Sequence, residues 1–74
     1  MKVIDLFLRL KFTSYIEVYT EENDMLAIGK LSDIIDFIYE NVPYPAWLNS
    51  LVTLIDFNKD SGNIEIRVKG GSYV

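Results

Sequence analysis

The segment from Val3 to Phe12 has an apolar pattern that fits two kinds of element. On a helix, Lys2, Asp5 and Arg9 form one polar stripe, and the apolar residues form a broad opposite face. On a strand, the same residues alternate between apolar and mixed positions. Because the run is rich in leucine and poor in β-branched residues, we predict a helix, with a strand as the alternative.

A hairpin is predicted next. Tyr15 to Thr20 is mostly β-branched or aromatic, which is typical of a strand. Glu21 to Asp24 is a polar turn, and Met25 to Lys30 returns as the second strand. Gly29, near the end of this strand, indicates a bulge or a close approach of the backbone.

A second helix is predicted from Asp33 to about Glu40. Ser32 is a suitable N-cap, and Asn41 followed by Pro43 ends the helix. The next segment, residues 42–50, contains two prolines and the single tryptophan of the chain, so we expect a rigid loop.

The last third of the chain predicts a second hairpin. Ile64 to Val68 alternates apolar with charged residues, as a strand with one solvated face does. Leu51 to Ile55, the first part of a strand that ends at Phe57, is more uniformly apolar and is predicted to be the more central strand. Residues 70–74 are predicted to be a flexible tail.

These elements predict an α+β fold in the order helix, hairpin, helix, hairpin. We expect residues 1–69 to form one domain, in which an antiparallel sheet of about four strands carries both helices on one face. A chain of 74 residues has room for one core, and its 50% apolar content excludes a disordered segment.

Composition excludes several classes of site. The sequence has no cysteine and no histidine, which rules out disulfides, zinc sites held by these residues, thiol nucleophiles and histidine bases. The lack of disulfides favours the cytoplasm. Asp5 and Arg9 interrupt the first apolar run, unlike a signal peptide, and no run is long enough to span a membrane. We predict a protein that is not an enzyme, binds no cofactor or metal and has no membrane association.

The net charge of −4 argues against binding to nucleic acid, which requires clustered Lys and Arg. The acidic residues of the middle third could instead form one face that meets a basic partner, although a solvated surface is the usual explanation for such charge. This candidate acidic face consists of Glu17, Glu21, Glu22, Asp24, Asp33, Asp36 and Glu40.

The segment from Asp56 to Ile64 resembles the start of an EF-hand-like calcium loop. Asp56, Asn58 and Asp60 could supply three oxygen ligands, but Gly62 comes one place late and Arg67 stands where a bidentate Glu is expected. A hairpin turn requires the same residue types, so we predict a turn and no metal site.

Large side chains in the proline-rich loop form a candidate interface. Tyr44, Trp47 and Leu48 would lose little entropy on binding, because the prolines already restrict the loop. The alternative is a loop that closes the core of a small domain. Both possibilities remain open at this point.

Four segments together resemble small uncharacterised proteins carried by phages, prophages and mobile elements of Gram-positive bacteria. These segments are residues 2–6, 16–19, 29–33 and 64–68. The resemblance implies a host cytoplasm and a role as an accessory or host-interacting protein, and it brings no activity or cofactor. We therefore predict a protein–protein interaction or assembly module, and as the alternative an acidic inhibitor or DNA mimic that occupies a basic site on a host or phage protein.

Self-association as a homodimer is the last prediction from the sequence. Half of the residues are apolar, and two hairpins leave edges with unpaired backbone groups, so something must cover them. Two-fold symmetry is the commonest solution. The candidate contacts are the strand from Tyr15 to Thr20 and the loop that contains Trp47.

Overall fold

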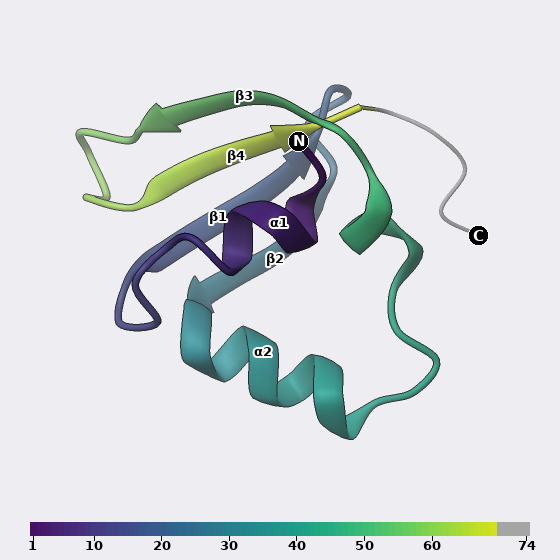
Figure 1. Ribbon diagram of the computed structural model, residues 1–74. Helices are drawn as coiled ribbons and strands as arrows, with labels where there is room; N and C mark the ends of the chain where they lie inside the picture. The colour runs from purple at the N-terminus through teal and green to yellow at the C-terminus, as the bar shows by residue number, and fades with distance from the viewer. Residues whose placement is uncertain (70–74) are drawn as a thin grey trace.

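One sheet contains all four strands of the computed structural model, which describes residues 1–69 (Figure 1). The strands are β1 (Tyr15–Thr20), β2 (Met25–Lys30), β3 (Val52–Phe57) and β4 (Ile64–Val68). The helices are α1 (Val3–Phe7) and α2 (Leu31–Glu40), followed by the short 3-10 helix η1 (Ala46–Asn49). The α+β class is therefore confirmed. The predicted tail, residues 70–74, lies outside the described residues.

The sheet is mixed, so the prediction of an antiparallel sheet was wrong. Its strand order is β2-β1-β4-β3; each hairpin is antiparallel, but β1 and β4 run parallel at the centre. The reason lies in the connection between the hairpins. Because α2 and the loop after it return the chain along the sheet, β3 runs in the same direction as β2, and β4 therefore runs parallel to β1 (Figure 1).

The strand that was predicted to be central is at the edge. β3 pairs only with β4, whereas β1 and β4 each have two neighbours. The buried residues Ile16, Val18, Ile66 and Val68 come from these two central strands. The apolar run of β3 therefore did not indicate a central strand. Leu54, Ile55 and Phe57 are apolar although they lie on an edge strand and are about half exposed.

The core lies on one face of the sheet. Alternate residues of β1 and β4 point toward it, and both helices and η1 pack against them. The helical residues of this core are Val3, Leu6, Phe7, Leu31, Ile34, Ile38, Trp47 and Leu48. No helix within residues 1–69 covers the other face, which we call the open face; it includes Glu17, Tyr19, Glu65 and Arg67.

The first helix is shorter than predicted and the second begins earlier. α1 ends at Phe7, and a turn follows in which the Ser14 N–H donates to the Lys11 carbonyl at 2.9 Å. α2 begins at Leu31, so Ser32 is not its N-cap. The N–H groups of Leu31 and Ser32 instead donate to the carbonyls of Ser14 and Phe12, in the loop between α1 and β1, at 2.8 and 3.0 Å. These bonds satisfy donors that an N-cap side chain would otherwise serve.

Candidate functional site

The edge strand β3 carries apolar residues that neither helix covers. Leu54, Ile55 and Phe57 are 47%, 50% and 59% exposed. The pairing of β3 with β4 places Ile55 and Phe57 on the face of the core and Leu54 on the open face. The second half of β3 therefore exposes apolar surface on both sides of the sheet.

Backbone groups of the same residues face outward. The Asn58 N–H donates to the Asn63 carbonyl at 2.9 Å, so the backbone of Asn58 faces β4. Since successive residues of a strand alternate their direction, the groups of Ile55 and Phe57 face away from β4. The carboxylate of Asp56 accepts the outward Phe57 N–H at 2.8 Å. Both backbone groups of Ile55 and the Phe57 carbonyl lack a partner within residues 1–69.

The first half of this edge is already covered by the N-terminal residues. The Val52 N–H donates to the Met1 carbonyl at 2.8 Å, and Lys2 forms an isolated antiparallel bridge with Leu51. The Val3 N–H donates to the Ser50 carbonyl at 3.0 Å. These bonds limit the free edge to the segment from Leu54 to Phe57.

The opposite edge of the sheet, formed by β2, is less regular. An extra residue, Leu26, interrupts its pairing with β1, and Gly29 has a φ of 138°. The strand ends in Lys30, where α2 begins. Bulges, irregular backbone and charged residues are the features by which edge strands resist pairing with other chains. The segment of β3 from Leu54 to Phe57, by contrast, pairs with β4 without a register shift, so it is the candidate segment for pairing with another strand.

A buried carboxylate organises the open face. Glu17 is 5% exposed, and its Oε1 accepts a hydrogen bond from the Tyr19 hydroxyl at 2.9 Å. Its Oε2 accepts from the Ser61 hydroxyl at 2.9 Å and from Nδ2 of Asn63 at 2.8 Å. We call these four residues the Glu17 network. It attaches the β3–β4 loop to β1, and both carboxylate oxygens are occupied by protein donors.

Hydrogen bonding shifts the acidity of two groups in this network. The bonds from Asn63, Ser61 and Tyr19 lower the pKa of Glu17 below its ordinary value of 4.5, against the opposing effect of desolvation. Donation to Glu17 is also the main reason that the pKa of Tyr19 is raised above 10.0. Both shifts favour a charged Glu17 and a neutral Tyr19 at neutral pH.

Arg67 connects β4 to the turn between β1 and β2. Its Nε lies 3.3 Å from Oε2 of Glu65, and its Nη1 donates to the Thr20 carbonyl at 3.2 Å and to Oδ1 of Asn23. The guanidinium carbon lies 5.1 Å from the centre of the Tyr19 ring. These contacts connect Arg67 to β1 and to the turn that follows it.

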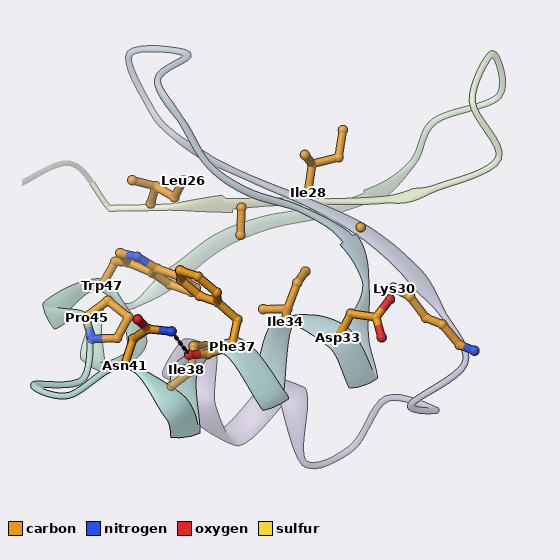
Figure 2. A pocket seen from close by; sticks show the side chains of 12 residues that line it. Leu26, Ile28, Lys30, Asp33, Ile34, Phe37, Ile38, Asn41, Pro45 and Trp47 are labelled. Atoms are coloured by element: carbon orange, nitrogen blue, oxygen red, sulfur yellow. Dashed lines mark hydrogen bonds between the residues drawn. The ribbon is translucent and has the colours of Figure 1, made fainter.

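Apolar pockets lie beside the helices. One, of about 430 Å³, lies between β2 and α2, with Trp47 and Pro45 at one end and Lys30 and Asp33 at the other (Figure 2). Nδ2 of Asn41 at its rim donates to the Phe37 carbonyl at 2.7 Å (Figure 2). Another, of about 360 Å³, has an apolar lining from α1 and the segment after it, from α2, and from the loop and 3-10 helix that follow: Ile4, Phe7, Leu8, Phe12, Ile35, Ile38, Tyr39, Tyr44 and Leu48.

The candidate interface in the proline-rich loop divides into buried and exposed parts. Trp47 and Leu48 belong to the core, and the Trp47 ring meets the Phe7 ring edge-on at a centroid distance of 6.1 Å. Tyr44 is exposed and contacts Tyr39 of α2 in the same manner at 6.0 Å. Trp47 and Leu48 thus close the core. An interface at this loop stays a prediction, and Tyr44 is the one of the three residues whose side chain is exposed.

The seven residues of the candidate acidic face lie on different surfaces. Glu17 is buried on the open face, on the opposite side of the sheet from α2. Three of the others lie in the turn after β1, and three lie on α2; they are Glu21, Glu22, Asp24, Asp33, Asp36 and Glu40. The fold therefore does not bring all seven carboxylates together.

The loop that resembles a calcium site forms a hydrogen-bonded turn. Oδ1 of Asn58 accepts from the backbone N–H groups of Asp60 and Ser61 at 3.0 and 3.3 Å. The Gly62 N–H donates to the Asn58 carbonyl at 2.7 Å, and Gly62 has a φ of 76°. Within the described residues, no group of three or more His, Cys, Asp or Glu side chains could hold a metal ion.

In the same part of the chain, no helix is long and apolar enough to cross a membrane.

The comparisons with known proteins found no matching family model, no matching curated protein and no matching solved structure. The resemblance to proteins of phages and mobile elements therefore stays a prediction.

Sequence reasoning missed the exposed edge of β3 and the Glu17 network. The apolar residues Leu54 and Ile55 carried a signal, but a run of this kind does not distinguish a buried strand from an exposed edge. Asp56 was the available indication, because a charge within such a run is typical of an edge strand. Nothing in the sequence indicated the contact between Glu17 and Asn63, which are 46 positions apart.

Proposed function

We propose that this chain is a non-enzymatic protein–protein interaction module that binds another polypeptide along the edge of β3. The observation that carries the proposal is the combination, at Ile55, of a half-exposed apolar side chain with outward backbone groups that lack a partner. A strand added at this edge would satisfy those groups and cover the neighbouring apolar residues. Both gains arise from the same contact.

Strand addition supports recognition in a defined way. Backbone hydrogen bonds to Ile55 would supply affinity, and alternate side chains of the partner would contact Ile55 and Phe57 on one face and Leu54 on the other. The Glu17 network supports this role, because it attaches the β3–β4 loop to β1 and so fixes one end of the edge. A preformed edge loses little conformational entropy on binding.

The expected setting of this module is the cytoplasm, where a host or phage protein is the expected partner. The absence of cysteine supports a reducing compartment. The alternative role as an acidic inhibitor or DNA mimic has weaker support, because Glu17 is separated from the carboxylates of α2 by the sheet. We therefore propose the edge of β3, rather than an acidic face, as the binding surface.

Site-specific photocrosslinking in cells tests this function. A photoreactive phenylalanine analogue replaces Ile55 in one variant and Ile28 in the other. Ile28 is the matched control, because it is 54% exposed, is also an isoleucine, and lies on the opposite edge strand β2. We expect adducts at position 55, mapped by mass spectrometry to an extended segment of a partner polypeptide, and few at position 28.

Either of two results would overturn the proposal. One is that neither position yields an adduct above background; the other is that both positions yield the same adducts, which indicates non-specific contact. An adduct between two copies of this chain at position 55 counts as support, because the proposed function does not require the partner to be a different protein.

A further inference from the structure

We infer that the partner strand at this edge is β3 of a second copy, paired antiparallel about a two-fold axis that passes through Ile55. The inference rests on the proposed function, since it names the occupant of the same edge. Two copies of one strand that pair antiparallel are related by a two-fold axis, and this symmetry gives a closed dimer. The registers available to β3 can then be compared from its hydrogen bonds and charges.

The register centred on Ile55 satisfies the outward groups of that residue. Ile55 and its copy would exchange two backbone hydrogen bonds, because both residues direct N–H and C=O away from β4. This register places Leu54 opposite Asp56 of the copy on the open face. It leaves the bond from the Phe57 N–H to the Asp56 carboxylate intact, so formation of the central pair breaks no hydrogen bond of the monomer.

The two neighbouring registers are less favourable. A pairing centred on Asp56 sets two aspartates directly opposite each other, and like charges in this arrangement are destabilising. The pairing of β3 with β4 shifts register between Val52 and Leu54, so a bulge lies at Thr53. A pairing centred on Leu54 sets Thr53 beside the axis, opposite Ile55. The Ile55 register avoids the repulsion between aspartates, and it places Thr53 farther from the axis, opposite Phe57 at each end of the contact.

The position of β3 in the fold is compatible with a second copy at this edge. β3 lies at one edge of the sheet, and α2 follows β2 at the opposite edge (Figure 1). Pairing would bring Ile55 of each copy together on the face of the core, where both are half exposed in the monomer. Because Met1 and Lys2 already cover the first half of each strand, the contact is short and the dimer should be weak.

Analytical ultracentrifugation from micromolar to millimolar concentration tests the inference. The unsubstituted chain should change from monomer to dimer over this range. Ile55→Lys places two charges opposite each other at the axis and should weaken the dimer about tenfold or more. Ile28→Lys, which adds the same charge on the other edge, should leave the dimer unchanged. Thermal melts of both variants verify that each remains folded.

A gain of affinity tests the register independently of any folding defect. In the Ile55 register, Leu54→Lys creates two opposite-charge pairs with Asp56 and should tighten the dimer about threefold or more. In a register centred on Leu54, the same change sets two lysines together and weakens the dimer. A monomer at every concentration, a dimer insensitive to Ile55→Lys, or a dimer weakened by Leu54→Lys overturns the inference.

The proposed function can survive such a failure. If the chain is monomeric but position 55 crosslinks specifically to another protein, self-pairing is wrong and strand addition stands. If position 55 gives no specific adduct and the chain does not dimerise, both are wrong. A specific adduct between copies at position 55, together with dimerisation, supports both.

Discussion

The carboxylate of Glu17 accepts a hydrogen bond of 2.8 Å from Nδ2 of Asn63, across 46 positions of sequence. Glu17 lies on the central strand β1, and Asn63 lies in the loop that joins β3 to β4. The contact therefore connects the most protected part of the sheet to the loop that follows the exposed edge. The stability of the loop should depend on the charge of this one residue.

We expect the stability of the protein to fall in acid because Glu17 takes up a proton. Its pKa is lowered in the folded state, so its contribution is present above its unfolded pKa of about 4.5 and is lost as the pH falls through the folded pKa. Glu17→Gln should cost about 1–3 kcal/mol at neutral pH, because it leaves polar groups imperfectly paired. The variant should also lose less stability than the unsubstituted chain below pH 4.5. Urea unfolding at several pH values measures both effects.

The matched control for this prediction is Glu65→Gln. Glu65 lies on the same open face and contacts Arg67, but its side chain is partly exposed, so its removal should cost about 1 kcal/mol or less. Equal losses for the two variants would show that Glu17 has no special role in the fold.

Removal of the Asn63 amide should raise the pKa of Glu17. Asn63 is the largest of the hydrogen-bonding causes that lower this pKa, so Asn63→Ala should move the titration of Glu17 toward higher pH. NMR titration of the side-chain carboxyl carbon measures this directly. Asn49→Ala, a change at an exposed asparagine in η1, is the control and should have no effect. An unchanged pKa in Asn63→Ala contradicts the described network.

The elements of this fold were more predictable than their arrangement. The alternation in Ile64 to Val68 and the β-branched run from Tyr15 to Thr20 each identified a strand, because local pattern determines local structure. The parallel pairing of β1 with β4 was not predicted, since it depends on the path that α2 imposes on the chain. The strand from Tyr15 to Thr20 was also considered as an edge contact for a dimer, but β1 is paired on both sides.

The candidate site was predictable only in its chemistry. The apolar character of β3 was evident from the sequence. Whether Leu54 and Ile55 are buried depends on which part of the sheet the two short helices cover, and the core residues of these helices pack on β1 and β4. Trp47 was noted as an anchor that either closes the core or forms an interface, and only the packing against Phe7 distinguishes these roles. Burial is a property of the whole fold, which a single segment does not specify.

Two glycines should respond differently to the same substitution. Gly29 has a φ of 138° and Gly62 a φ of 76°, and in neither case would an added Cβ meet an atom within 4 Å. Asparagine tolerates the left-handed region near the value of Gly62, but it does not tolerate the value of Gly29. Gly29→Asn should therefore cost about 1–3 kcal/mol, and Gly62→Asn clearly less. Chemical denaturation measures both, and equal losses contradict the backbone conformation described for β2.

Substitution of Trp47 should reduce stability rather than remove an interface. The Trp47 ring packs within the core against Phe7, so Trp47→Ala should cost about 3–5 kcal/mol, which is a large share of the total for a small domain. Tyr44→Ala, in the same loop but at an exposed position, should cost about 1 kcal/mol or less. Urea denaturation measures both losses, and ultracentrifugation below the unfolding transition measures the dimer. A Trp47→Ala variant that keeps its stability but no longer dimerises would place the interface at this loop instead of β3.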